Sequence, residues 1–374
     1  DPNDRDLAMS TPSLFSALAL SCLLMSTPAL DAGQIVVAHR GASGYLPEHT
    51  FAAKVLAHAQ GADYLEQDVC LTRDNIPIVI HDIHLEGTTD VAARFPGRAR
   101  ADGHFYALDF TLEEIRQLDA HERVNAAGKP VFPTRFGLGE PRFEVHTLDE
   151  EIELIQRLNR ECGRNAGLYV EIKRPAFHAR EGRDITRIVI ECLSRHGYTS
   201  RESNCWIQCF DSTALKRLRG EFACELRLTQ LVSDNSKGED SQDDYAAMRT
   251  PAGLDEVARY ADAIGPSITQ IVRLNEAGMP TVTGLVADAH AAGLSVCPYT
   301  LRRDNLPANV TEDAMLDLLF TRAGVDGLFT DFPDSAVAYL RQECLRSSAD
   351  AAPSDGTPTP APDITADEGR ERSH

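Results

Sequence analysis

The sequence predicts an α/β fold, a TIM-type (β/α)8 barrel, and three observations lead to this fold class. Short β-rich runs alternate with amphipathic helical stretches, which is typical of a parallel sheet covered by helices. One run can only be the return arm of a hairpin, which leaves the strand number of a barrel. Polar residues follow several runs, where a barrel has its active site. The predicted strands are 35–39, 64–69, 78–81, 168–172, 205–209, 227–232, 263–265, 296–299 and 327–330.

The second and third of these runs are too close in sequence to be parallel neighbours. Between the wider stretches 64–72 and 76–82 that contain them lie only Arg73, Asp74 and Asn75, whereas a parallel connection needs a crossover of about a dozen residues. We therefore expect the two runs to pair antiparallel, which leaves eight strands for the barrel. If the turn is centred on Asp74 and Asn75, Asp68 faces His81 across the hairpin.

The barrel domain is predicted to span residues 33–346. Capping boxes mark two of its helix starts, with Thr111 three residues before Glu114 and Thr147 three residues before Glu150. The stretch 83–145 is too long for an ordinary barrel loop. We expect it to carry one helix, 112–118, and to form an insertion subdomain that serves as a substrate-recognition cap.

The two ends of the chain are predicted to lie outside the barrel. Within residues 1–32, the apolar run 14–25 has the length of a signal-peptide core and is too short to span a bilayer. The pair Ser21-Cys22 gives a weaker lipoprotein signal. The tail 347–374 is rich in Pro, Ser, Thr, Ala and Asp, which indicates disorder. We expect a periplasmic or secreted protein without a transmembrane span.

The charge composition of the chain argues against some classes of binding partner. The 374 residues carry 57 acidic and 37 basic side chains, for a formal net charge of −20. This field repels nucleic acid and anionic membranes, so neither is expected to be the main partner. A phosphate-bearing substrate would also be repelled unless a cation reverses the local sign. The nine cysteines are too sparse for a disulfide framework and most are expected to be buried thiols, although one bridge stays open.

Three acids are expected to converge at the carboxyl ends of the strands. Glu66 and Asp68 share one face of the second strand, and Glu171 ends the strand at 168–172. Converging carboxylates repel one another unless a cation lies among them. Ligation by oxygen alone suits Ca²⁺ or Mg²⁺ better than zinc. The three residues are therefore predicted to be metal ligands.

Two histidines at strand ends are predicted to be the catalytic pair. His39 and His81 lie beside the proposed metal carboxylates, where one can serve as general base and the other as general acid. Arg40 can hold a phosphate with two parallel hydrogen bonds, and Lys173 adds a compact positive charge. The residues do not decide which histidine is the base.

An ordered series of motifs resembles the bacterial glycerophosphodiester phosphodiesterases, most closely their periplasmic branch. The likeness extends from about residue 34 to residue 340. The motifs are HRGASGYLPEHT at 39–50, EQDV at 66–69, LTRD at 71–74, HD at 81–82, TTDVA at 88–92, DFTL at 109–112, QCFD at 208–211, PYT at 298–300 and GLFTDFP at 327–333.

The resemblance implies a TIM barrel with a characteristic insertion after His81. It implies a divalent cation, usually Ca²⁺, on Glu66, Asp68 and Glu171, a catalytic pair of His39 and His81, and Arg40 and Lys173 on the phosphate. Gln208, Tyr299 and Asp331 match further pocket positions, and Glu48 is expected to brace the first loop. The implied reaction converts substrates such as glycerophosphocholine or glycerophosphoethanolamine into glycerol 3-phosphate and an alcohol.

Two departures from the family pattern leave open which alcohol the enzyme prefers as the leaving group. Cys297 stands where the periplasmic branch commonly has His, and the sequence Ser267-Ile268-Thr269 also differs; both are expected near the pocket mouth.

Two other functions stay open. A lysophospholipase D or sphingomyelinase-D-like enzyme would share the barrel and the histidines, although the long insertion should narrow access for acylated lipids. An envelope-anchored binding protein would keep the fold without the catalysis.

Overall fold

Eight parallel strands form a barrel in the part of the chain that the structure, a computed structural model, describes: residues 33–139, 141–236 and 239–350, the side chains of 347–350 excepted. The sheet order is β10-β7-β6-β5-β4-β2-β1-β11. The strands are β1 (Ile35–Ala38), β2 (Tyr64–Leu71), β4 (Gly167–Ile172), β5 (Cys205–Cys209), β6 (Arg227–Val232), β7 (Ala263–Pro266), β10 (Ser295–Val296) and β11 (Gly327–Thr330).

Backbone hydrogen bonds between the segments that contain β10 and β11 bring the two ends of this sheet together. Asp326 N donates to Val296 O (2.9 Å), and Phe329 N donates to Pro298 O (3.0 Å). The barrel is therefore nearly closed, and the predicted TIM-type (β/α)8 fold is confirmed. Its strands are almost continuously buried because helices cover the outside and side chains fill the inside.

The predicted hairpin is present, but its register differs from the prediction by one residue. Strand β3 (Pro77–Val79) pairs antiparallel with β2, with Val69 opposite Val79, and Ile80 N donates to Asp68 O (2.8 Å). Asp68 therefore faces Ile80 instead of His81. The loop has three residues centred on Asp74 and ends at Asn75 with φ 62°, a left-handed residue of the kind that closes such loops.

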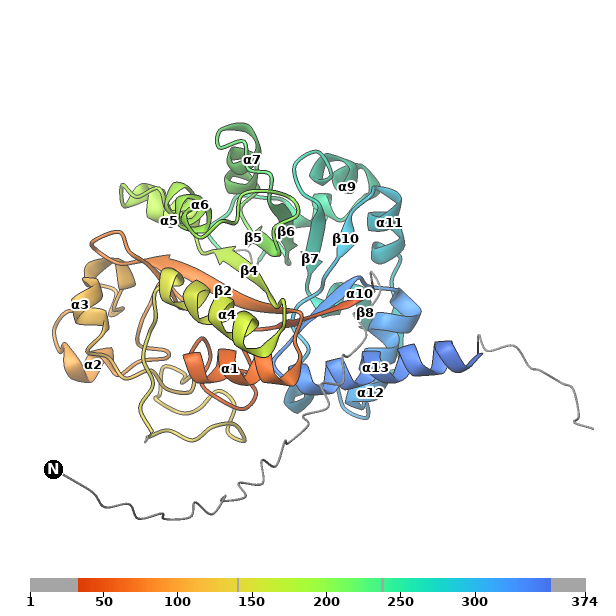
Figure 1. The fold of residues 1–374 in the computed structure, drawn as a ribbon, viewed down its shortest axis with the longest axis horizontal. Coiled ribbons are helices and arrows are strands. Elements are labelled where there is room, and N and C mark those ends of the chain that lie inside the picture. Colours follow the sequence, from red (N-terminus) through yellow and green to blue (C-terminus); the bar gives the residue numbers. More distant parts are fainter. Residues whose placement is uncertain (1–32, 140, 237–238, 351–374) are drawn as a thin grey trace, which may run out of the picture. The chain divides into compact units, whose positions relative to one another are not determined.

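Helices surround the barrel strands in chain order, as Figure 1 shows for α4, α6, α7, α9 and α11. The helix α13 packs against α1 and β1. Outside the insertion, the α-helices are α1 (Phe51–Gln60), α4 (Leu148–Cys162), α5 (Pro175–Arg180), α6 (Ile185–Arg195), α7 (Ser212–Gly220), α8 (Tyr245–Met248), α9 (Pro251–Val257), α10 (Ile268–Ile271), α11 (Leu285–Ala291), α12 (Glu312–Leu316) and α13 (Pro333–Asp350). The other elements are the 3-10 helix η2 (Arg303–Asn305), the π-helix η3 (Asp317–Ala323) and a hairpin of β8 (Val272–Leu274) and β9 (Pro280–Val282).

Local sequence signals explain where these helices begin and end. The predicted capping boxes are formed at both positions, because the Thr111 and Thr147 side chains accept from the N3 backbone and the N3 glutamates reach back. Gly163 ends α4 at φ 63°, a conformation that glycine adopts without steric cost. None of the helices in the described part of the chain combines the length and hydropathy that crossing a bilayer requires.

Two groups of buried residues stabilise the barrel. The large outer core lies between the strands and the helices. A small inner group consists of Val37, Tyr64, Tyr169, Cys297 and Phe329, and alternation along the strands places it inside the barrel. Cys297 is 4% exposed there and does not line the site cavity described below, so its predicted position near the pocket mouth is wrong. One aromatic ring of this group, that of Phe329, also lines the site cavity.

The insertion of residues 83–145 contains little regular structure and lies beside the barrel, with α2 and α3 at its edge in Figure 1. Its elements are α2 (Val91–Arg94), η1 (Ala107–Asp109) and α3 (Leu112–Ile115). The predicted helix 112–118 is thus too long. Gln117 N donates to Glu114 O (3.1 Å) and Leu118 N to Ile115 O (3.0 Å), so the last turn tightens to i→i−3 bonds.

Several predictions concern the ends of the chain and the cysteines. The leader 1–32, the lipoprotein signal at Cys22 and most of the tail 347–374 lie outside the described residues, while α13 continues to Asp350, past the predicted start of the tail. Six of the eight described cysteines are buried, and Cys162 and Cys344 are exposed. This agrees with their prediction as mostly buried apolar residues.

Candidate active site

The three predicted acids meet inside the carboxyl end of the barrel. Glu66 and Asp68 lie on β2 and Glu171 on β4, where register places Asp68 directly beside Glu171. Ligand oxygens of all three lie within 4.8 Å of one another, and each residue is at most 5% exposed. Burial and repulsion by Asp68 raise the pKa of Glu66 to about 8. Burial also raises the pKa of Glu171, although Lys173 opposes this. A cation among the acids would relieve the repulsion.

Hydrogen bonds orient these acids and leave some oxygens without a partner. Glu66 accepts from Arg40 N (2.8 Å) through one oxygen and from Gln208 Nε2 (2.8 Å) through the other. Asp68 Oδ2 bonds to His49 Nε2 (2.7 Å), whereas Asp68 Oδ1 and Gln208 Oε1 are buried without a partner among the described residues. Buried oxygen acceptors that converge in this way fit a hard divalent cation.

His39 and His81 approach the acids from the ends of β1 and of the β3 arm. His39 Nδ1 bonds to Asp331 Oδ1 (2.6 Å), and its Nε2 lies 3.9 Å from Glu66 Oε2. His81 Nδ1 bonds to Asp82 Oδ1 (2.7 Å). In both rings a carboxylate holds Nδ1 as the donor, which leaves Nε2 free to accept a proton.

The pKa values of both imidazoles are lowered. Burial is the main cause at His39, where Arg40 also contributes and Asp331 opposes the shift, and the pKa falls to about 3. Burial lowers the pKa of His81 as well, again with contributions from Arg40 and Lys173. A lowered pKa favours the neutral ring, which is the state that a general base requires, so either imidazole could take that role.

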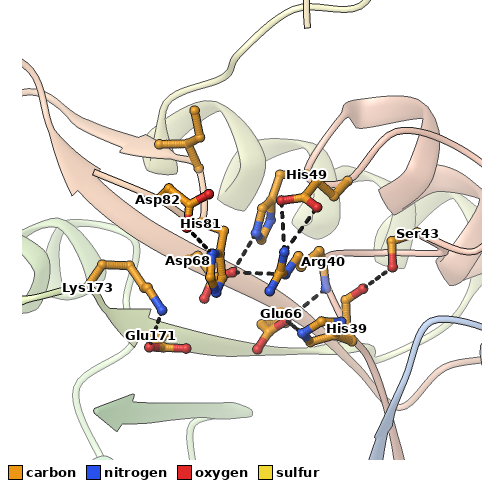
Figure 2. A network of polar contacts seen from close by, with 12 residues as sticks. His39, Arg40, Ser43, His49, Glu66, Asp68, His81, Asp82, Glu171 and Lys173 are labelled. Atoms are coloured by element: carbon orange, nitrogen blue, oxygen red, sulfur yellow. Dashed lines mark hydrogen bonds and ion pairs between the residues drawn. The ribbon is translucent and has the colours of Figure 1, made fainter. Parts of the chain in front are cut away.

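The predicted cations face the same space. Arg40 Nη1 donates to both oxygens of Glu48 (3.0 Å each), and its Nε lies 3.6 Å from Asp68 Oδ2. Lys173 Nζ lies 2.6 Å from Glu171 and 2.6 Å from Glu239. Figure 2 shows His39 beside Glu66 and Lys173 beside Glu171. Glu48 braces the first loop through Arg40, as the resemblance implied, and lies outside the group of three acids.

A cavity of about 180 Å³ joins these groups. The structure brings together every predicted site residue, with Asp68 beneath the cavity wall. The lining residues predicted from the sequence are His39, Arg40, Glu66, His81, Glu171, Lys173, Gln208 and Tyr299, and those not predicted include Phe210, Thr300 and Arg302. The Ser267-Ile268-Thr269 segment lines a neighbouring groove that shares Tyr299 with this cavity, which agrees with its predicted place near the mouth.

Sequence reasoning missed five charged or polar residues of this site. His49 holds Asp68, Glu239 holds Lys173, and Arg123, Arg135 and Arg302 hold the acids around the histidines. His49 lies within the HRGASGYLPEHT motif, so the sequence offered a signal from which it could have been predicted as a site residue. The others come from loops and from the insertion, and no local pattern distinguishes them from surface charges.

The fold and the site define a class. Acids, cations and histidines gathered at the carboxyl ends of barrel strands are the arrangement of a (β/α)8-barrel enzyme, and the cations suit an anionic substrate.

Comparisons with known proteins identify the family within that class. The model of the "Glycerophosphoryl diester phosphodiesterase family" matches residues 39–335. The glycerophosphodiester phosphodiesterase of Haemophilus influenzae is 40% identical, over 85% of this chain and 92% of that protein. The one from Treponema pallidum is 38% identical, over 87% and 95%. The chain therefore belongs to the glycerophosphoryl diester phosphodiesterase family, and it is an enzyme, a phosphoric diester hydrolase.

Solved structures agree on the fold. A phosphodiesterase from Oleispira antarctica, in complex with the product sn-glycerol-3-phosphate, has a TM-score of 0.56 at 22% identity and covers 83% of this chain and 97% of its own. A glycerophosphodiester phosphodiesterase from Agrobacterium tumefaciens has a TM-score of 0.53 at 24% identity, over 82% and 99%.

Proposed function

We propose that this enzyme hydrolyses glycerophosphodiesters, such as glycerophosphocholine and glycerophosphoethanolamine, to glycerol 3-phosphate and an alcohol. The observation that carries the proposal is the convergence of two carboxylate-oriented histidines on three buried acids in one small cavity. Family membership and the relatives from Haemophilus influenzae and Treponema pallidum support the same substrate class.

Glu66, Asp68 and Glu171 would hold a divalent cation, Ca²⁺ by preference and Mg²⁺ as the alternative. The set supplies only oxygen ligands, includes the partnerless Asp68 Oδ1, and places Gln208 Oε1 nearby. When bound, such an ion neutralises negative charge on the phosphodiester oxygens. The chain itself orients the acids through Arg40 N, His49 and Gln208.

His39 and His81 would form the acid–base pair. One imidazole Nε2 removes a proton from the attacking hydroxyl, a water molecule or the glycerol hydroxyl of the substrate, as its oxygen bonds to phosphorus. The other imidazole, in its protonated form, donates a proton to the alcohol oxygen as the phosphorus–oxygen bond breaks. A glycerol hydroxyl as nucleophile produces a cyclic phosphate that water opens in a second step.

Arg40 and Lys173 would hold the phosphate in the cavity. Both are buried beside acids, so their charges are fixed in position and poorly screened by solvent. Their placement offsets the net charge of −20 where an anionic substrate must bind. Gln208 and Tyr299 line the same cavity and would contact the rest of the substrate.

A coupled assay for glycerol 3-phosphate tests the proposal. Wild-type enzyme with glycerophosphocholine should release glycerol 3-phosphate in the presence of Ca²⁺ and lose this activity with excess chelator. H39A and H81A should each be slower by about 10²–10⁴-fold. Near-normal turnover in either folded variant would contradict the catalytic assignment, and activity that survives exhaustive chelation would contradict the metal assignment.

The same preparation distinguishes the substrate classes. A rate on lysophosphatidylcholine above that on glycerophosphocholine would instead indicate a lysophospholipase D. A cavity of about 180 Å³ favours the deacylated substrate, because an acyl chain needs far more apolar surface than this polar site offers.

We also propose that the protein is exported to the periplasm or secreted. The apolar run 14–25, with small residues after it, supports this proposal. Cell fractionation and N-terminal sequencing of the mature protein test it. An intact N-terminus on cytoplasmic protein would contradict it, and a lipid on Cys22 would show anchoring.

A further inference from the structure

Two arginines of the insertion contact the carboxylates that orient the two histidines. Arg123 Nη1 lies 2.5 Å from Asp82 Oδ2, and the other oxygen of Asp82 bonds to His81 Nδ1 (2.7 Å). Arg135 Nη2 lies 2.7 Å from Asp331 Oδ2, and the other oxygen of Asp331 bonds to His39 Nδ1 (2.6 Å). Each carboxylate thus holds a histidine with one oxygen and an arginine with the other.

Each of the two arginines also forms an ion pair with a second acid, and this acid lies outside the insertion. Arg123 donates to both oxygens of Glu48 (2.7 and 2.9 Å), the residue that also braces Arg40. Its side chain is 18% exposed. Such planar, two-bond contacts are strong and specify orientation as well as distance. Arg123 is therefore connected to His81 through Asp82 and to Arg40 through Glu48.

Arg135 is fixed in a different way. It donates to both oxygens of Asp304 (2.8 and 3.0 Å), and its guanidinium lies 3.6 Å from the ring centre of Phe132. Its side chain is only 4% exposed. Asp331 has a further cation, because Arg302 Nε lies 2.9 Å from the same oxygen. In contrast, Asp82 has no ion-pair partner other than Arg123 and His81 among the described residues.

A carboxylate that holds a histidine can orient it only if the carboxylate is itself held. With one oxygen bonded to the imidazole and the other unpaired, the group can rotate, and the imidazole then loses its tautomer and its direction. The arginines remove this freedom. A Lys at either position would keep the charge but lose the planar fork.

We propose that Arg123 and Arg135 are positioning residues for phosphodiester hydrolysis, through which the insertion orients both histidines. This inference rests on the proposed catalytic roles of His39 and His81. It assigns the insertion a part in the chemistry in addition to any effect on substrate access. It also predicts different kinetic signatures, because Arg123 reaches a histidine and the phosphate-binding Arg40, while Arg135 reaches a histidine alone.

Lysine variants of three insertion arginines test the inference. Arg100 is the matched control, because it also makes two-bond contacts, to Asp109 and to Glu181 of the barrel, but neither acid bonds to His39 or His81. We expect R123K to lower kcat about 100-fold and to raise KM. R135K should lower kcat about 10-fold with KM unchanged, since Arg302 stays on Asp331. R100K should retain kcat and KM within about twofold.

Two further measurements separate positioning from simple stability. The ¹⁵N spectra of the histidine side chains should show loss of the single Nδ1–H tautomer at His81 in R123K and at His39 in R135K, with no change in R100K. D82N breaks the ion pair by a second route, and its kcat loss should not add to that of R123K. D82N alone tests this link if R123K does not fold.

The outcomes are distinguishable from those of the proposed function. If H39A and H81A are inactive while folded R123K and R135K retain wild-type kcat, the positioning inference is wrong and the proposed function stands. If R100K loses kcat as much as the other two variants, the arginines merely hold the insertion, and the inference is wrong again. If H39A and H81A stay active, the proposed function itself fails.

Discussion

His49 Nε2 lies 2.7 Å from Asp68 Oδ2, and both side chains are at most 4% exposed. His49 lies in the loop after the first strand in a left-handed conformation (φ 60°), and its ring reaches Asp68 on β2. Its Nδ1 lies 3.3 Å from Lys54 Nζ. A buried histidine that fixes a proposed metal ligand is an outer-shell partner of the metal, and such partners govern metal affinity.

We predict that H49A weakens cation binding about 10–100-fold without abolishing the fold. Asp68 would lose the bond that fixes its second oxygen and would have to reorient when the cation binds. Activity titrated with Ca²⁺ measures the apparent affinity. H58A is the control, because His58 is also a buried histidine but bonds to Asn159 away from the site. Equal affinities for H49A and wild type would contradict this role.

Strand β11 offers a second comparison, between its two flanking aspartates. Asp331 follows the carboxyl end and bonds to His39, whereas Asp326 precedes the amino end and bonds to His290 Nε2 (2.8 Å). In barrels the carboxyl end carries function and the amino end carries stability. We predict that D331N lowers kcat by about 10²–10⁴-fold and that D326N lowers the melting temperature with kcat nearly unchanged. Steady-state kinetics and thermal unfolding of D331N and D326N test this difference. Comparable losses of kcat in the two variants would contradict the prediction.

Cation binding should also change stability, because three buried acids repel one another unless a cation lies among them. We predict that Ca²⁺ at about 100 times its Kd stabilises the wild type by about 2.7 kcal/mol through mass action. E171Q should lose most of this Ca²⁺-dependent gain, since it removes a ligand. Thermal unfolding with and without Ca²⁺ measures the effect. A wild-type protein whose melting temperature does not respond to Ca²⁺ or Mg²⁺ would speak against this site.

The order of strands and the residues of the site could be predicted because both depend on local patterns. Alternation, caps and the spacing of the hairpin arm are visible in the sequence, and strand ends bring Glu66, Asp68 and Glu171 together once the barrel is assumed. The register of the hairpin could not be predicted, because it depends on whether the turn has two central residues or three. The left-handed conformation of Asn75 is typical of a turn with three central residues.

The contacts of the insertion could not be predicted for a different reason. Arg123 lies 75 residues from Glu48, and Arg135 lies 196 residues from Asp331. An arginine in a polar loop has the same local pattern whether it is solvated or reaches the site. Only the three-dimensional path of the insertion separates Arg123 and Arg135 from Arg100.

A histidine away from the site connects pH to the stability of the barrel. His178 on α5 is 1% exposed, accepts from Leu71 N (3.3 Å) through Nε2 and bonds to Arg174 O (3.0 Å) through Nδ1. A donor on one side and a carbonyl on the other require the neutral ring with its proton on Nδ1. Burial lowers its pKa from 6.5 to about 4, although the backbone bonds oppose this shift.

We therefore predict that His178 makes stability fall as the solution is acidified from pH 6.5 toward pH 4. The folded state binds the proton less tightly than the unfolded chain, so the stabilisation is fully present above pH 6.5 and is lost as pH falls through the folded pKa. One pKa unit corresponds to about 1.4 kcal/mol, so between pH 7.5 and pH 5 the loss from this residue should be about 1–2 kcal/mol. Urea unfolding of wild type and H178Q at both pH values measures it. The variant should be less stable at pH 7.5 and should lose less stability on acidification. Parallel losses in the two proteins would show that other groups, and not His178, govern the acid sensitivity.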